Sequence, residues 1–179
     1  MRAVALASSA REHGNDPFGA LLVTESGVVV EAENTVVTAS DPTGHAETNL
    51  VRLAASQLTS AELTTATLYT STEPCAMCAG AIYWAGISRV VFGLREGELR
   101  ALTGSDPRNP TLALPCREVF ARGQRPIEVI GPLLEGEARA VDTALLVEPA
   151  EQALAASLAE IGPAAGAAFA RGDYTASLQ

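Results

Sequence analysis

One histidine, one glutamate and two cysteines have the types and spacing that suit a metal-dependent reaction. His45 and Glu47 are two residues apart, and further along the chain Cys75 and Cys78 form a C-x-x-C pair. Zinc prefers a tetrahedral set of nitrogen and sulfur ligands, and a catalytic zinc site keeps one position open. One imidazole and two thiolates leave the fourth position for water. We therefore expect His45, Cys75 and Cys78 to hold a catalytic Zn²⁺.

Glu47 is the candidate proton carrier of this site. Bound zinc lowers the pKa of its water to about 7, which supplies a nucleophile at neutral pH. An offset of two residues does not place His45 and Glu47 on one helix face, so a ligand role for Glu47 is not expected. Glu47 is expected instead to accept the water proton and to act as the proton carrier for the substrate. In a substrate that is an amino-substituted ring, it would pass the proton to a ring nitrogen and protonate the leaving amine.

Each of these residues also has a simpler interpretation. A lone histidine such as His45 is often a core or capping residue, and a C-x-x-C pair can be redox-active. A non-catalytic, zinc-stabilised interaction domain is a rival of another class, and it requires a fourth protein ligand. Cys116 is the only spare thiol and is expected to be a buried spectator, while His13 is expected to be solvated.

The elements that must position these residues follow from apolar periodicity and breakers. Leu50, Leu53 and Leu58 recur near helical spacing after His45, and Pro74 favours a helix start at Cys75. The positive end of that helix favours thiolates. Strands are expected at 18–24, 28–34, 66–72, 88–94 and within 126–134, and helices at 1–12, 45–58, 75–85, 115–122, 135–147 and 151–161. Residues 101–114 are rich in turn formers.

Charge and composition limit the partners. The 179 residues carry a net charge of −9, with twelve arginines and no lysine, which disfavours a nucleic acid or an anionic membrane as partner. No apolar stretch reaches the roughly 18 residues of a membrane span, and the first dozen residues do not have the pattern of a signal peptide. We expect a soluble, cytoplasmic protein with a small-molecule substrate.

The motifs resemble those of the cytidine deaminase-like superfamily, in the branch of bacterial guanine deaminases and tRNA adenosine deaminases. The likeness covers roughly residues 1–95, and its motifs are H-x-E at 45–47, P-C-x-x-C at 74–78, P-F-G-A at 17–20, D-P-T at 41–43 and A-I-Y-W at 81–84. It implies an α/β fold, namely a three-layer α/β/α sandwich with a five-stranded mixed sheet, and a homodimer. We expect a deaminase domain over 1–150, and a C-terminal helix and tail over 151–179 that covers the active site or a dimer partner.

The same resemblance implies substrate contacts. Asn34 is expected to hydrogen-bond the substrate ring, Ala46 to lie against the substrate, and Trp84 to stack on the ring. Asp106 lies where such guanine deaminases carry a second acidic residue that helps to move protons. Simpler roles stay open: Asn34 could merely end a strand, Trp84 could pack between helices or in a dimer interface, and Asp106 could belong to an Asp-Pro turn. Phe18 is expected in the core, and Glu118 is another acidic candidate.

Together these observations predict a zinc-dependent hydrolytic deaminase. Its expected substrate is a nucleobase, a nucleoside or a related amino-heterocycle, with a guanine-like purine favoured. The alternatives are a tRNA adenosine deaminase, which needs a basic surface for RNA, and the non-catalytic zinc-stabilised domain.

Overall fold

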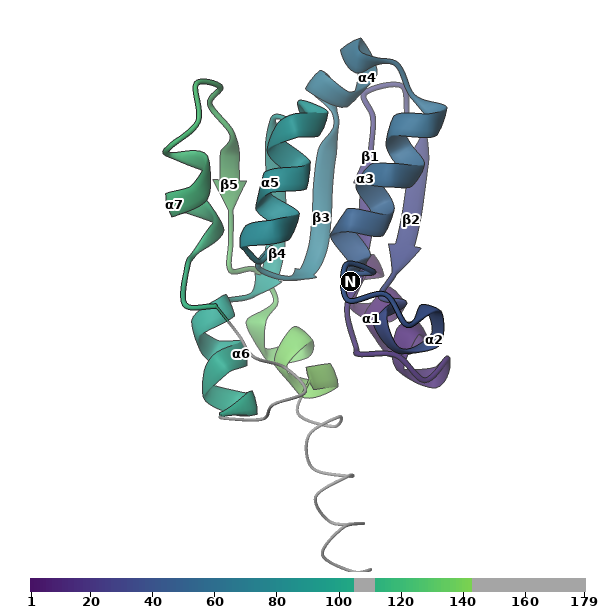
Figure 1. Cartoon of the computed structure of the whole chain (residues 1–179), viewed down its shortest axis with the longest axis vertical. Coiled ribbons are helices and arrows are strands. Elements are labelled where there is room, and N and C mark those ends of the chain that lie inside the picture. Colours follow the sequence, from purple (N-terminus) through teal and green to yellow (C-terminus); the bar gives the residue numbers. More distant parts are fainter. Residues whose placement is uncertain (105–111, 143–179) are drawn as a thin grey trace, which may run out of the picture. The chain divides into compact units, whose positions relative to one another are not determined.

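In the computed structural model, residues 1–104 and 112–142 are described, and a five-stranded mixed sheet lies at their centre (Figure 1). The strands are β1 Gly19–Val23, β2 Val29–Glu33, β3 Thr67–Thr72, β4 Arg89–Leu94 and β5 Glu128–Ile130, in the order β2-β1-β3-β4-β5. β1 runs antiparallel to β2 and β3, whereas β3, β4 and β5 are parallel. The predicted five-stranded mixed sheet is confirmed.

Helices cover both faces of this sheet. They are α1 Arg2–Glu12, α2 Val36–Ala39, α3 Ala46–Gln57, α4 Ser60–Thr65, α5 Ala76–Ala85, α6 Glu96–Thr103 and α7 Cys116–Phe120, and residues 135–142 are also helical. α3 packs against α5, and α5 against α7, while α1 contacts β1, β2 and β3. Figure 1 shows α3 and α5 in front of the sheet and α1 behind it. The predicted three-layer α/β/α arrangement is therefore confirmed.

The alternation of β1 explains how the two helical layers approach the sheet. Ala20 and Leu22 are fully buried and join the core cluster that includes Leu50 of α3. Gly19 faces the other layer, where a Cβ atom would lie 2.5 Å from the backbone nitrogen of Ala7 in α1. Only a residue without a side chain lets α1 pack this closely.

Most predicted elements are present, and three helices, α2, α4 and α6, were not expected. α4 begins with a capping box in which Thr59 and Glu62 exchange hydrogen bonds, a local signal that the sequence does carry. α6 begins at Glu96, ahead of the segment 101–114 that was predicted to be rich in turns, and overlaps that segment at residues 101–103. Residues 135–142 agree with the first part of the helix predicted at 135–147. The predicted segment 151–179 lies outside the described residues.

The chain divides into the units Met1–Leu145 and Leu146–Gln179, and the fold above belongs to the first. Within residues 1–104 and 112–142, no helix combines the length and the apolar character needed to cross a bilayer.

Candidate active site

The starts of two neighbouring helices bring the predicted metal ligands together. His45 is the N-cap of α3, Cys75 is the N-cap of α5, and Cys78 lies in the first turn of α5. The Sγ atom of Cys75 lies 3.7 Å from Nδ1 of His45, and the three ligand atoms all lie within 4.8 Å of one another. Two thiolates on a tetrahedral zinc ion are about 3.8 Å apart, given a Zn–S bond of about 2.3 Å. The donor set and its spacing therefore fit zinc.

The electrostatics of the two thiols prepare them for a cation. A hydrogen bond from Cys78 lowers the pKa of Cys75 to about 4, with a further contribution from His45 and against the effect of burial. The pKa of Cys78 is raised because it shares its proton with Cys75 and is buried. The hydrogen bond with Cys75 likewise raises the pKa of His45. One thiolate is thus present at neutral pH, and a metal ion would displace the remaining proton.

Cys116 is not part of this ligand group. Its side chain is fully buried, its backbone N–H donates to Oε1 of Glu73 at 3.0 Å, and burial raises the pKa of its thiol. Among the described residues, the spare thiol does not close the site, as the rival structural interpretation would require.

Glu47 lies beside the ligands as a buried carboxyl group. Its side chain is 6% exposed, and the hydroxyl of Thr70 on β3 donates a hydrogen bond of 2.6 Å to its Oε1 atom. Burial raises the pKa of Glu47, while the hydrogen bond from Thr70 opposes that shift. The arrangement suits a group that must take up and release a proton.

A cavity of about 260 Å³ opens in front of these residues. Its walls are mostly apolar. The acidic or metal-ligating side chains that line it are those of His45, Glu47, Glu73 and Cys75, together with Glu96 of α6. The lining residues are Phe18, Pro42, His45, Glu47, Thr72, Glu73, Cys75, Ala76, Met77, Glu96, Leu99 and Leu112. Phe18, which we expected in the core, both packs on the core and lines this cavity. The volume lies near the lower end for small-molecule sites, about 300–1,000 Å³.

Glu73 and Glu96 are two buried carboxyl groups that the motifs did not single out. Glu73 accepts a hydrogen bond from the backbone N–H of Glu96 at 3.2 Å and another from that of Cys116 at 3.0 Å. It therefore ties the starts of α6 and α7 to the end of β3. Burial, followed by the negative charges of Cys75, Glu73 and Glu47, raises the pKa of Glu96 to about 7.

A topological signal could have found both carboxyl groups. Glu73 follows β3 directly and Glu96 follows β4 closely, and these two strands are parallel neighbours. Residues at the carboxyl ends of adjacent parallel strands meet at one edge of a sheet, where ligands bind.

The predicted substrate contacts differ in their surroundings. Asn34 is 1% exposed, and its Oδ1 accepts a hydrogen bond from the N–H of Val36 at 2.9 Å. Its amide nitrogen has no hydrogen-bond partner among residues 1–104 and 112–142. Ala46 is fully buried, belongs to the core and does not line the cavity, so its predicted contact with the substrate stays a prediction.

Trp84 is 81% exposed, packs edge-to-face on Tyr83 with ring centroids 5.6 Å apart, and does not line the cavity. Glu118 does not line it either. Asp106 lies outside the described residues. The roles predicted for Trp84 and Asp106 stay predictions.

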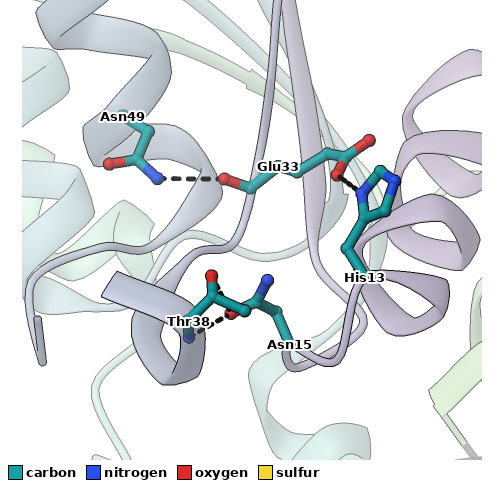
Figure 2. A network of polar contacts seen from close by, with 5 residues as sticks. All are labelled: His13, Asn15, Glu33, Thr38 and Asn49. Carbon is teal, nitrogen blue, oxygen red and sulfur yellow. Dashed lines mark hydrogen bonds and ion pairs between the residues drawn. The ribbon is translucent and has the colours of Figure 1, made fainter. Parts of the chain in front are cut away.

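A network of polar contacts holds the loop between β2 and α3 (Figure 2). Oδ1 of Asn15 accepts hydrogen bonds from the N–H and the hydroxyl of Thr38, both at 3.0 Å. The amide of Asn49 donates to the carbonyl oxygen of Glu33 at 2.9 Å and to that of Gly44 at 3.1 Å. These bonds fix the backbone that carries Asn34 and His45. The side chain of His13, which we expected to be solvated, is indeed 64% exposed, and its Nδ1 atom lies 2.8 Å from Oε2 of Glu33.

Comparisons with known proteins agree with this geometry. Residues 1–94 match the family model described as the cytidine and deoxycytidylate deaminase zinc-binding region. The chain is 43% identical over 136 residues to the probable cytosine deaminase of Schizosaccharomyces pombe, covering 76% of this chain and 83% of that protein. It is 47% identical over 106 residues to the guanine deaminase of Bacillus subtilis, covering 59% and 67%.

Solved structures show the same fold. A guanine deaminase from Nitrosomonas europaea superposes with a TM-score of 0.64 at 27% identity, covering 80% of each chain. A structure from a study of tRNA:A34 deaminases superposes with a TM-score of 0.60 at 30% identity, covering 78% of this chain and 94% of that one.

Proposed function

Since this chain belongs to the family of the cytidine and deoxycytidylate deaminase zinc-binding region, we propose that it is a zinc-dependent hydrolase that releases ammonia from a small amino-heterocycle. One observation carries the proposal: His45 and Cys75, whose ligand atoms lie within 4.8 Å of that of Cys78, line a small cavity together with the buried carboxyl group of Glu47. A structural zinc site would have neither the cavity nor the carboxyl group.

The proposed reaction needs a nucleophile and a proton carrier. When bound by His45, Cys75 and Cys78, zinc supplies the Lewis acidity that makes water a nucleophile near neutral pH. Glu47 takes one proton from that water and transfers it to a nitrogen of the ring. It then takes the second proton from the newly attached hydroxyl group and gives it to the departing amine. Thr70 keeps the Glu47 carboxyl group in place through its 2.6 Å hydrogen bond. The products are ammonia and the hydroxylated heterocycle.

Binding of the ring is assigned to the remaining cavity walls. Phe18 and Leu99 offer apolar surface to a flat ring. Asn34 is not among the residues that line the cavity, and its proposed role rests on its amide nitrogen, which has no partner among the described residues and could donate to a ring acceptor. The predicted homodimer remains a proposal, and in it Trp84 would have a second copy against which to pack.

A guanine-like purine is the first candidate substrate. The guanine deaminases of B. subtilis and N. europaea are similar to this chain in sequence and in fold. Cytosine is the second candidate, because the similarity to the S. pombe protein extends over more of this chain. The net charge of −9 and the lack of lysine disfavour an RNA substrate.

The test is ammonia release by the zinc-loaded protein from guanine, adenine, cytosine, their nucleosides and triazine analogues. We expect turnover of at least one base, and we expect Glu47→Gln to retain zinc while kcat falls about 10²–10⁴-fold. Glu98→Gln is the matched control, because Glu98 pairs on the surface with Arg139. The proposal would be refuted if none of these compounds released ammonia, or if Glu47→Gln kept full activity.

A further inference from the structure

Glu96 is a buried carboxyl group that faces the cavity and has no assigned task. It is 5% exposed and lines the same cavity as His45, Glu47 and Cys75. Among residues 1–104 and 112–142, its side chain has no hydrogen-bond or ion-pair partner. Because these carboxyl oxygens have no protein partner and Glu96 lines the cavity, they are free to accept a hydrogen bond from a ligand bound there.

The backbone around Glu96 keeps this carboxyl group available. Glu96 is the first residue of α6, and its own N–H is already bound by Glu73. Both carboxyl oxygens of Glu73 accept hydrogen bonds from backbone N–H groups, namely those of Glu96 and Cys116. It therefore fixes the position of Glu96 and has less capacity left for a ligand.

Glu98 on the same helix shows the contrast. Its side chain is 43% exposed and pairs with Arg139 at 3.3 Å, away from the cavity. Two acidic residues in one helix turn thus have different surroundings, and only Glu96 faces the place where a ring would bind.

We propose that Glu96 determines specificity: its carboxyl group accepts a hydrogen bond from a ring N–H or amino N–H of the heterocycle in the cavity. The inference rests on the proposed function and narrows its substrate class. It favours bases whose edge carries N–H donors, as guanine does at N1 and at its amino group. Methylation of the contacted nitrogen removes the donor and adds bulk.

The test measures binding, so that it does not depend on turnover. Zinc-loaded Glu47→Gln protein is compared with the double variants that add Glu96→Gln or Glu98→Gln, by equilibrium dialysis with guanine, cytosine and singly N-methylated guanines. At about pH 8, where the carboxyl group of Glu96 is mostly ionised, we expect Glu96→Gln to weaken binding of the preferred base about tenfold, because a hydrogen bond to a charged acceptor is replaced by a neutral one. Glu98→Gln should change it less than twofold. For one methylated guanine the loss on Glu96→Gln should disappear.

Retained zinc and an unchanged melting temperature show that the variant is folded; if Glu96→Gln does not fold, Glu96→Asp, which keeps the charge and shortens the side chain, is measured in the same way. An equal loss for every ligand, no loss, or no binding of any base overturns the role of Glu96. Failure of the proposed function appears separately, as the absence of ammonia from the wild-type protein.

Discussion

Replacing Thr70 by valine tests whether Glu47 must be held in place to act. Valine has nearly the shape of threonine, so the change removes the hydroxyl group that donates to Oε1 of Glu47 at 2.6 Å and little else. Glu47 keeps its carboxyl group and its place in the chain. Any loss of activity then reports on the hydrogen bond.

The size of the effect follows from the surroundings. Thr70 is 3% exposed and Glu47 is 6% exposed, so water does not readily replace the lost donor. A hydrogen bond to a charged group contributes about 1.5–3 kcal/mol. If that amount is lost from the transition state, kcat falls about 10–150-fold, since about 1.4 kcal/mol corresponds to a factor of ten. This loss is smaller than that expected for Glu47→Gln.

The assay is the steady-state rate of ammonia release, with zinc content and melting temperature measured on the same samples. Thr67→Val is the matched control: Thr67 lies on the same strand and is 8% exposed, and its side chain has no hydrogen bond among the described residues. We expect the control to retain its rate within about threefold, an allowance for ordinary effects of a single substitution. If Thr70→Val keeps full kcat with normal zinc content, the hydrogen bond to Glu47 is not needed and the reasoning fails.

Three further predictions concern the metal, the packing and the response to pH. Cys75→Ala should lose both zinc and activity because one of three ligands is gone, and elemental analysis that finds one zinc per chain would contradict the ligand assignment. Gly19→Ala should destabilise the protein by about 1–3 kcal/mol in urea unfolding, because its Cβ would lie 2.5 Å from the backbone nitrogen of Ala7. Gly27→Ala is the control, since its Cβ would meet nothing within 4 Å and the variant tests only the strain of a positive φ. Equal stability of Gly19→Ala and the wild type would argue against the close approach of α1. Burial raises the pKa of Asp142 to about 7 from its usual 3.8, so between about pH 4 and 7 the folded protein holds a proton that the unfolded chain has released. The free energy of unfolding should therefore fall as pH rises through that range, by at most about 4 kcal/mol. Asp142→Asn should remove this part of the pH dependence, which urea titrations of both proteins at pH 5 and pH 8 would reveal.

Much of the fold could be predicted because its signals are local. Apolar residues at helical spacing after His45, and a proline before Cys75, mark two helix starts without reference to any distant residue. The five strands were likewise predicted from short runs of apolar and β-branched residues. α6 was missed because glycine and charged residues obscure its period, although Glu96 and Glu98 in its first turn are favourable for a helix start.

The types and spacing of the metal ligands, and the place of Glu47 close to one of them, follow from the sequence alone. The reason is that His45 and Glu47, and likewise Cys75 and Cys78, lie within one helix cap and its first turn. The three-dimensional arrangement was needed to show that these two helix starts meet, that Thr70 reaches Glu47 from β3, and that Glu73 and Glu96 converge on the same cavity. It also left Trp84 exposed and away from that cavity. The physical reason is that such contacts depend on which strands pair and which helices pack on them, and therefore on interactions between residues far apart in the chain.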